Sequence, residues 1–482
     1  MTRRPTDPDR PAILLITADQ LRKDALGCYG GQAVSTPNID RIGALGATYD
    51  RAYTASPWCL PSRSSLLTGR YPRNHGAYSN FRDTSLSPTV PNLYQALGAD
   101  RPDQPGYRIG HIGKCHYAPV PYHDTRADRT LPYDAFRDYY KSLGIQHLDL
   151  QDDKQVSVWF YDDYARELEA AGLLEAYRSG VWDREARKVF PFPGPVEWHP
   201  DAWVGRKATE WIASYDEDRP LFGWISFSGP HFPFDPPAEY LERVDESLIG
   251  EPLVDPSEWE DPDRLHYRSF HGPSQGRMEG GGYHDRGADY WRRLRLHYLA
   301  NVALIDDEVG KVIEMAEERF GDNLVVLFTC DHGEMLGNHG FWGKNRCFYS
   351  DVLNVPLLFR QPKTASDSDR GATSDRLTSL VDVFPTILDL AGLDPGDGID
   401  GRHLQDDGHD YVFAEGERFQ VVTDGKHKLV TAHVEGTDYL ELYDLGTDPC
   451  EMVDVAGTAA YAESQRDLAS AALRGTIAST LP

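Results

Sequence analysis

Acidic and imidazole side chains follow two apolar runs of this chain. Asp19 and Gln20 come just after the run 12–17, and Asp331 and His332 come just after the run 324–329. Carboxylate and amide oxygens suit a hard divalent cation, and the single imidazole nitrogen admits Mn²⁺ or Mg²⁺ beside Ca²⁺. Alone, either pair would be an ordinary turn after a strand. Together they predict one divalent metal site.

A cysteine stands in an unusual setting, because Cys59 opens the sequence CLPSR and the sequence LLTGR follows at 66–70. The usual fate of a free cysteine is burial as a small apolar side chain. Pro61, however, is typical of the first turn of a helix, and the free N–H groups of a helix N-terminus favour an anion. A metal site and cations elsewhere in the chain would make Cys59 part of a reactive centre.

The segments that carry these residues alternate between strands and helices. Strands are predicted over 12–17, 107–113, 222–228 and 324–329, and helices over 36–52, 298–319 and 380–392. This alternation is typical of an α/β fold with a large, mostly parallel central sheet flanked by helices. In such folds ligands bind outside the carboxyl ends of the strands, which is where both polar pairs are expected.

Two domains are predicted. Residues 1–402 form the catalytic α/β domain, and residues 403–482 a smaller C-terminal α+β subdomain with strand-like runs at 411–415, 419–423 and 427–432 and a helix near 460–473. Within the larger domain, residues 117–200 and 246–290 are polar and rich in turns. Long insertions of this kind are often functional, so we expect them at the rim of a substrate pocket.

The charge of the chain limits its partners. It has 49 Lys and Arg against 76 Asp and Glu, a formal net charge of -27, which argues against nucleic acid or an anionic membrane. An anionic substrate would therefore need a local cluster of cations. No apolar run approaches the roughly 20 residues that span a bilayer, and no signal peptide is recognised. Six cysteines without paired spacing favour a reduced, cytoplasmic protein, and a periplasmic or secreted protein made as a longer precursor is the alternative.

Further motifs accompany the stretch around Cys59 along nearly the whole chain. They are GKCH at 113–116, SGPHFPFDPP at 228–237, CDHGEMLGNHG at 330–340, GKNRCFYSDVLNVPLLFR at 343–360 and LYDLGTDPCE at 442–451. Taken jointly with the metal pairs, they resemble the type I, formylglycine-dependent sulfatases of the alkaline phosphatase superfamily.

The resemblance implies an alkaline-phosphatase-like fold, a maturation step and a metal site. Cys59 would be converted to C-formylglycine by a formylglycine-generating enzyme, and the aldehyde hydrate would be the nucleophile. One divalent metal ion would be bound, with Ca²⁺ expected first and Mn²⁺ or Mg²⁺ as alternatives. The implied metal ligands are Asp19, Gln20, Cys59, Asp331 and His332.

The same resemblance assigns roles to basic residues. Arg63 would hold the formylglycine hydroxyl, and four residues fall on the substrate-anion and acid–base positions of the family: Lys114, His116, His231 and Lys344. Such cations stabilise charge on a transferring sulfuryl group. Either His231 or Lys344 would protonate the leaving alcohol, and His116 would be the base that releases sulfate. Asn80 is a further candidate for a substrate contact.

Three functions remain open at this point. The first is a hydrolase for a small-molecule or carbohydrate sulfate ester, acting alone or as a homo-oligomer. The second is a phosphonate monoester or phosphodiester hydrolase, because Gln20 and His332 resemble that branch of the superfamily, although Lys114 and His116 count against it. The third is a non-catalytic binding protein with the same fold, against which the intact Cys59 and polar positions count.

Overall fold

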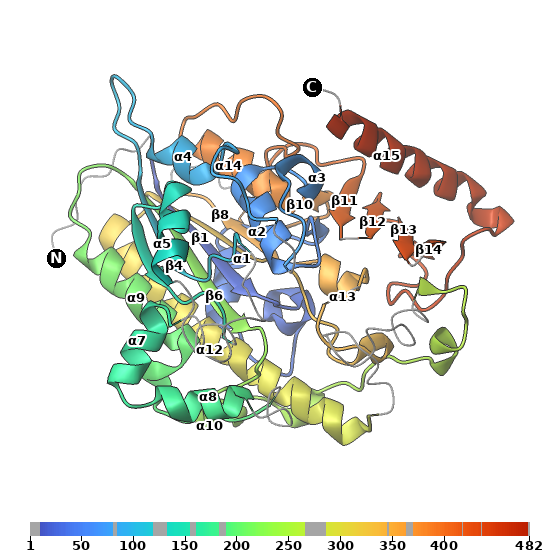
Figure 1. Cartoon of the computed structure of the whole chain (residues 1–482), viewed down its shortest axis with the longest axis horizontal. Coiled ribbons are helices and arrows are strands. Elements are labelled where there is room, and N and C mark those ends of the chain that lie inside the picture. Colours follow the sequence, from blue (N-terminus) through green and yellow to red (C-terminus); the bar gives the residue numbers. More distant parts are fainter. Residues whose placement is uncertain are drawn as a thin grey trace.

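One large sheet forms the centre of the computed structural model, and helices lie on both sides of it (Figure 1). The structure describes residues 10–80, 84–118, 133–154, 161–182, 189–265, 286–344, 347–362, 370–416, 418–434 and 436–480. Within them the sheet has eight strands in the order β5-β4-β6-β1-β7-β8-β2-β9. Their bounds are Ala12–Asp19 (β1), Ala47–Tyr49 (β2), Arg108–Gly113 (β4), His147–Leu150 (β5), Leu221–Pro230 (β6), Leu324–Cys330 (β7), Leu357–Arg360 (β8) and Ala372–Ser374 (β9).

The sheet is mostly parallel, as predicted. The strands from β5 to β7 all run in one direction, and β8 runs antiparallel to both of its neighbours. Every residue of β1, β6 and β7 is buried. Strands that are covered on both faces read as continuous apolar runs, which is why three of them were recognisable in the sequence.

Two groups of helices cover the sheet (Figure 1). On one side α2 (Cys59–Thr68) packs with α4 (Leu93–Gly98) and α14 (Val383–Leu390). On the other, α12 (Ala288–Phe320) packs against α9 (Pro200–Ser214) and α1 (Pro37–Ala44). All ten residues of α2 are buried. The first residue of α2, Cys59, is therefore placed by a helix that runs through the interior.

Two predicted helices have different bounds in the structure. The first was expected to reach residue 52, but α1 ends at Ala44 and the chain continues into β2 and then β3 (Ala52–Tyr53). Gly46 explains the break. A Cβ at this position would lie 2.1 Å from the carbonyl oxygen of Phe359, so only glycine lets the chain pass this close to β8. The second helix, α12, starts ten residues before the predicted residue 298.

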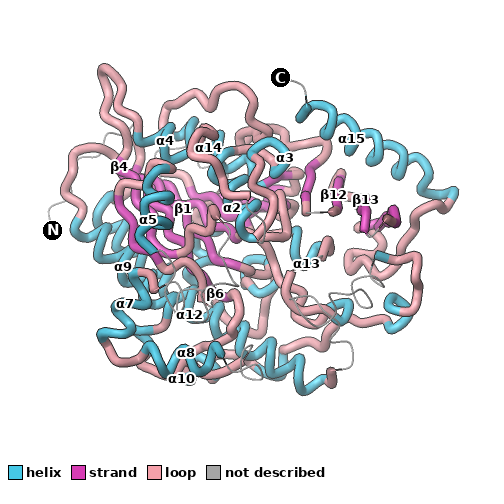
Figure 2. The backbone as a smooth tube through the Cα atoms, viewed as in Figure 1, coloured by secondary structure: helices cyan, strands magenta, loops and turns pink. Residues whose placement is uncertain are grey.

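The C-terminal part forms a separate antiparallel sheet (Figures 1 and 2). Its strands are β11 (Val412–Glu415), β12 (Phe419–Thr423), β13 (His427–Val434) and β14 (Thr437–Asp444), and α15 (Ala462–Thr480) packs along it. The predicted α+β character is confirmed, although β14 was not foreseen. The domain boundary after residue 402 stays a prediction. No described helix is long and apolar enough to cross a membrane.

The two polar insertions are partly helical where they are described. α5 (Tyr133–Ser142), α7 (Asp163–Ala170) and α8 (Leu174–Trp182) lie within 117–200, and the start of α12 lies within 246–290. The expected place of these insertions at a pocket rim stays a prediction. Residues 119–132, 155–160, 183–188 and 266–285 lie outside the described residues.

Candidate active site

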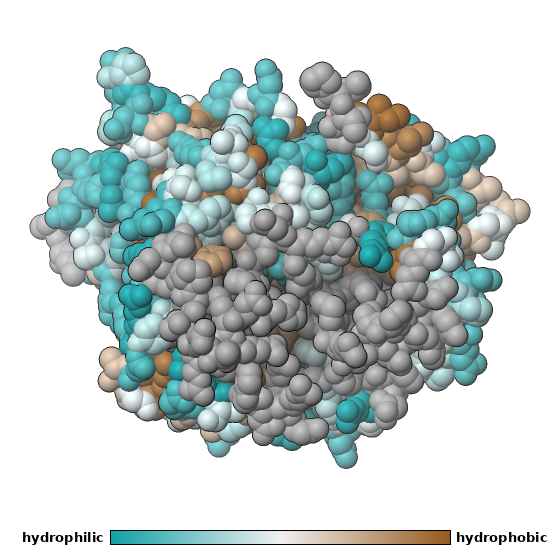
Figure 3. All heavy atoms as spheres, viewed as in Figure 1, coloured by the Kyte–Doolittle hydropathy of each residue, from teal (hydrophilic) through white to brown (hydrophobic). Residues whose placement is uncertain are grey.

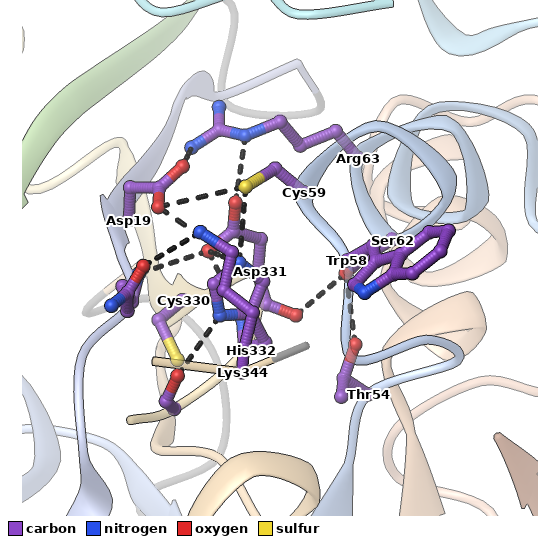
Figure 4. Close-up of polar contacts among 12 residues, drawn as sticks. Asp19, Thr54, Trp58, Cys59, Ser62, Arg63, Cys330, Asp331, His332 and Lys344 are labelled. Carbon is purple, nitrogen blue, oxygen red and sulfur yellow. Dashed lines mark hydrogen bonds and ion pairs between the residues drawn. The ribbon is translucent and has the colours of Figure 1, made fainter. Parts of the chain in front are cut away.

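The two acidic pairs meet because β1 and β7 are neighbouring parallel strands (Figure 4). Asp19 is the last residue of β1, and Asp331 and His332 follow β7 directly. The Nε2 atom of His332 lies 3.9 Å from Asp19 Oδ1 and 3.8 Å from Asp331 Oδ1. The parallel topology therefore brings these three buried side chains together, as the sequence predicted.

Cys59 reaches the same point from the first turn of α2. Its Sγ atom lies 3.1 Å from His332 Nε2 and 3.8 Å from Asp19 Oδ1. One ligand atom from each of Asp19, Cys59, Asp331 and His332 lies within 4.8 Å of all the others. Asn80 lies at the same helix end, where its Oδ1 accepts a hydrogen bond from the Leu60 N–H at 3.0 Å. In the described contacts Asn80 thus caps α2.

The residues of this cluster fit a divalent cation. His332 directs Nδ1 at the carbonyl of Gly333 (3.0 Å), so Nε2 is the atom that faces the cluster. Burial and Asp19 raise the pKa of Asp331 to about 6. Burial lowers the pKa of His332, but Asp331 and Cys59 raise it more, to about 9. Crowded negative charge thus raises the pKa of both groups, and a cation bound here would relieve the same crowding.

Gln20 completes the predicted ligand set, and its amide already contacts a cationic group. The ammonium of Lys344 donates to Gln20 Oε1 at 2.7 Å, while Gln20 Nε2 donates to the buried carboxylate of Glu334. The Gln20 backbone N–H donates to Asp331 Oδ1 at 3.1 Å, and Gln20 has a positive φ of 65°. By accepting the hydrogen bond from Nε2, Glu334 orients the amide of Gln20 so that Oε1 faces the ammonium of Lys344.

Arg63 lies beneath the cluster and joins its two carboxylates. Nε donates to Asp331 Oδ2 at 2.9 Å and Nη2 to Asp19 Oδ2 at 3.0 Å. Nη1 donates to the carbonyl of Lys114 and to Ser226 Oγ. Burial opposes the charge, but Asp331 and Asp19 raise the pKa of Arg63 above its ordinary value. Arg63 is one turn after Cys59 on α2, so the helix carries both.

Lys114 is held between two carboxylates. Its Nζ lies 2.8 Å from Asp19 Oδ2, 2.7 Å from Asp153 Oδ2 and 3.9 Å from Cys59 Sγ. Burial lowers the pKa of Lys114, but Asp153 and Asp19 raise it well above its ordinary value, so the ammonium stays charged. Asp153 was not recognised in the sequence. It follows the short strand β5, and its partner lies 39 residues earlier in the chain.

These cationic groups act on the thiol of Cys59. Burial and Asp19 raise its pKa, but three neighbours lower it more, and it falls from 9.0 to about 6. They are Lys114, Lys344 and His332. The position therefore favours negative charge on the side chain of residue 59.

Two imidazoles in the site are neutral. Burial and then Lys114 lower the pKa of His116 to about 4, and burial and then Lys344 lower that of His231 well below its ordinary value. Both ring nitrogens of His116 are buried and have no hydrogen-bond partner in the described part of the chain. His231 Nδ1 lies 2.7 Å from the carbonyl oxygen of Phe232, so Nδ1 carries the proton. Neither ring nitrogen of His116 is therefore bonded to a described residue.

A buried ion cluster behind the site joins three of its supporting segments. Lys154, next to Asp153, places Nζ 2.7 Å from Asp235 Oδ1 and 3.3 Å from Asp201 Oδ2. Asp201 Oδ1 accepts the Gly229 N–H at 2.8 Å, and all three charged side chains are fully buried. Because Gly229 and Asp235 flank His231 in the chain, Lys154 fixes the loop of His231 relative to Asp153.

Comparison with known proteins agrees with this geometry. Residues 11–393 match the family described as Sulfatase, and residues 337–476 match the family described as N-sulphoglucosamine sulphohydrolase, C-terminal. The chain is 26% identical over 475 residues to an arylsulfatase of Clostridium perfringens, covering 94% of this chain and 92% of the relative. It is 24% identical over 531 residues to an N-acetylglucosamine-6-O-sulfatase of Bacteroides thetaiotaomicron, covering 95% and 85%.

A solved structure extends the comparison to the fold. The phosphonate monoester hydrolase of Agrobacterium radiobacter superposes with a TM-score of 0.75 at 25% identity, covering 98% of this chain and 96% of that one. The Sulfatase match covers more than half of the chain and includes every residue of the cluster described above. The chain therefore belongs to the sulfatase family of the alkaline phosphatase superfamily, the enzymes that hydrolyse sulfate esters.

Proposed function

We propose that this enzyme hydrolyses the sulfate ester of a sulfated carbohydrate or small alcohol, with residue 59 as formylglycine and one divalent metal ion. The observation that carries the proposal is the position of Cys59, whose Sγ lies 3.1 Å from His332 Nε2 between Asp19 and two lysines. A packing cysteine has no need of this surrounding charge.

The metal site of the proposal uses Asp19, Gln20, Asp331, His332 and the side chain of residue 59. A bound divalent cation would supply Lewis acidity to a sulfate oxygen and to the nucleophile. An aldehyde at position 59 would supply, as its hydrate, one hydroxyl to attack sulfur and a second hydroxyl to allow release. Oxygen-rich ligands keep Ca²⁺ first, with Mn²⁺ and Mg²⁺ as alternatives.

The chain's own residues bind and orient the substrate anion. Lys114 and Lys344 supply fixed positive charge in a water-poor site, where it acts strongly on charge that develops during S–O cleavage. Asp153 and Asp19 keep Lys114 charged and immobile. Arg63 bridges Oδ2 of the two carboxylates, and Oδ1 of each lies on the side of His332, where both can face one cation.

Proton transfer is assigned from the charge states of the resting site. The neutral imidazole of His116 has no described hydrogen-bond partner at either ring nitrogen. It therefore suits a base that takes a proton during sulfate release. Because His231 is also neutral, it has no extra proton to give to a leaving alcohol. This favours Lys344 as the acid.

Phosphonate monoester hydrolysis is the second candidate. Gln20 and His332 support it, as does the similarity to the Agrobacterium radiobacter enzyme. Lys114 and His116, the pair that counts against this branch, both lie at the site. The reading as a non-catalytic binding protein is set aside, because the chain belongs to a family of enzymes.

Two measurements test the proposal. Mass spectrometry of the Cys59 peptide from the native host should show the lighter aldehyde form, and an unmodified thiol in all of the protein would contradict the mechanism. Side-by-side turnover of an aryl sulfate and an aryl phosphonate monoester should favour the sulfate. A dominant phosphonate rate would instead select the second candidate.

A further inference from the structure

A cavity lies away from Cys59, between the larger domain and the C-terminal sheet. Its volume is about 360 Å³, within the range of small-ligand sites. Three segments line it: Tyr71 to Asn74, which includes most of α3 (Pro72–His75), the chain from Asp400 to Phe413, and one face of α15. In Figure 1, α3, β11 and α15 meet in this region. The cavity shares no residue with the site around Cys59.

Three arginine side chains line this cavity together with the carboxylates of Asp400 and Asp410. Arg73, Arg402 and Arg474 line it, in a chain that carries 27 more acidic than basic groups. Arg402 donates to the carbonyl of Gly408, and neither Arg402 nor Arg474 forms an ion pair within the described residues. Asp400 also lines the cavity, but its oxygens accept from the Tyr71 N–H and from Asn74 Nδ2. Among the described residues, the guanidinium groups of Arg402 and Arg474 thus have no anionic partner.

Arg73 is held in place before any ligand arrives. Its guanidinium carbon lies 4.8 Å from the centre of the Tyr71 ring and 5.0 Å from that of Phe413, and it pairs with Glu415. Its Nε is buried and has no hydrogen-bond partner among the described residues. Side chains fixed in this way lose little entropy when they bind a ligand.

The composition of the wall indicates the chemistry of the ligand. Guanidinium groups recognise sulfate and carboxylate groups through paired N–H donors. Tyr71 and Tyr411 offer amphipathic rings, and the exposed carboxylate of Asp410 can accept hydrogen bonds from hydroxyl groups. An inorganic anion would use only the arginines. A sulfated sugar would use the arginines, the rings and the carboxylate.

We propose that this cavity binds a sulfated sugar residue and is a secondary carbohydrate site of the enzyme. The inference rests on the proposed function, which makes sulfated carbohydrates the substrate class. Cys59 and Tyr71 are separated by α2 and the turn after it, and ten helical residues alone span about 15 Å. The secondary site would therefore bind a different sugar residue from the one that loses its sulfate.

Three variants separate the secondary site from the catalytic one. The double variant Arg402→Gln/Arg474→Gln removes the unpaired charges. Gly475→Leu fills the cavity without a charge change, because a Cβ there would lie 3.1 Å from Phe413 Cζ and 3.4 Å from Arg73 Nη2. Arg466→Gln is the matched control, since it removes an exposed arginine from α15 that does not line the cavity.

The experiment uses calorimetric titration of the full chain carrying Cys59→Ala, which prevents turnover. The probes are a heparin-type sulfated disaccharide, its unsulfated counterpart and inorganic sulfate. We expect the sulfated disaccharide to bind at two sites, and the double variant and Gly475→Leu each to weaken one of them by tenfold or more. Arg466→Gln should leave both sites unchanged.

Separate outcomes overturn the inference and the proposed function. Equal binding by all variants, or one site throughout, would exclude the secondary site. Binding of inorganic sulfate but not of the disaccharide would show an anion site without a role for sugar. The same substitutions in the chain that keeps Cys59 should leave aryl sulfate turnover unchanged, and absence of that turnover in the unsubstituted enzyme would contradict the proposed function alone.

Discussion

Asp153 accepts a hydrogen bond from Lys114 over 2.7 Å inside the site, although the two residues belong to different strand ends. Lys114 follows β4, and Asp153 follows β5, which pairs with β4. The same ammonium is shared with Asp19 on the opposite side. A cation expected to bind an anionic ester, Lys114, is thus itself paired with the carboxylate of Asp153, which orients its ammonium group.

Removing this carboxylate should affect catalysis more than folding. We expect Asp153→Ala to lower kcat/KM by about tenfold, because Lys114 loses one of its two anchors. Asp153→Asn can still accept a hydrogen bond, so it should recover much of this loss. Steady-state kinetics on an aryl sulfate measure the effect, and two variants with unchanged kcat/KM would show that Asp19 alone fixes Lys114.

Removing the buried ammonium of Lys154 should destabilise the fold. Lys154→Met leaves Asp235 and Asp201 fully buried without their cation, a change that costs about 3–5 kcal/mol. Urea unfolding measures it. The control is Lys23→Met, which breaks a partly exposed pair with Asp50 and should cost less than about 1 kcal/mol. Similar losses in the two variants would contradict the role assigned to the buried cluster.

Removal of the proposed metal ion should lower stability. A cation that binds only the folded chain adds about 2.7 kcal/mol to the free energy of unfolding at a hundred times its dissociation constant. We therefore expect a chelator to lower the melting temperature and added Ca²⁺, Mn²⁺ or Mg²⁺ to restore it. His332→Ala should abolish the response, whereas the surface variant Asp50→Asn should keep it. A response that survives in His332→Ala would place the ion elsewhere.

Acid should destabilise the protein through two buried histidines. Burial lowers the pKa of both His75 and His111 from 6.5 to about 3. Below pH 6.5 these histidines become protonated in the unfolded chain but stay neutral in the folded chain. Their contribution to the free energy of unfolding is therefore fully present above pH 6.5 and is lost as the pH falls towards 3. Each histidine contributes up to about 1.4 kcal/mol per pH unit.

The pH effect can be isolated by substitution. His111→Gln should reduce the slope of unfolding free energy against pH between 6.5 and 3, measured by urea unfolding at a series of pH values. An equal slope in His111→Gln and the unsubstituted protein would contradict the assignment.

The sequence predicted the parts of the site that belong to apolar strands. Asp19 and Asp331 stand at the ends of uninterrupted buried runs. A run of this kind forms a central strand, so the polar residue at its end lies at the carboxyl end of the sheet. β2 was missed because its three residues follow a helix without a long apolar run, and its pairing with β8 and β9 makes it a strand. Local pattern does not contain that long-range contact.

The supporting residues could not be predicted for a related reason. Asp153 and Lys154 are charged residues in unremarkable local sequence, and Glu334 lies in the motif at 330–340 but had no role assigned to it. Their roles depend on partners far along the chain, 81 residues away for Lys154 and Asp235 and 314 for Gln20 and Glu334. Only burial distinguishes them from solvated charges. The predicted roles of Arg63, His116, His231 and Lys344 in catalysis stay predictions, although the charges of Arg63 and Lys344 lie close enough to interact with Cys59.

The burial of Cys59 sets a time limit on its chemistry. In the folded chain this side chain is 1% exposed, so an enzyme that oxidises it must act before the fold closes. His332, which closes one side, is synthesised 273 residues after Cys59. At a synthesis rate of about 5–20 residues per second, roughly 15–55 s pass between the synthesis of Cys59 and that of His332. Faster elongation would shorten this interval and reduce the share of chains that can be matured.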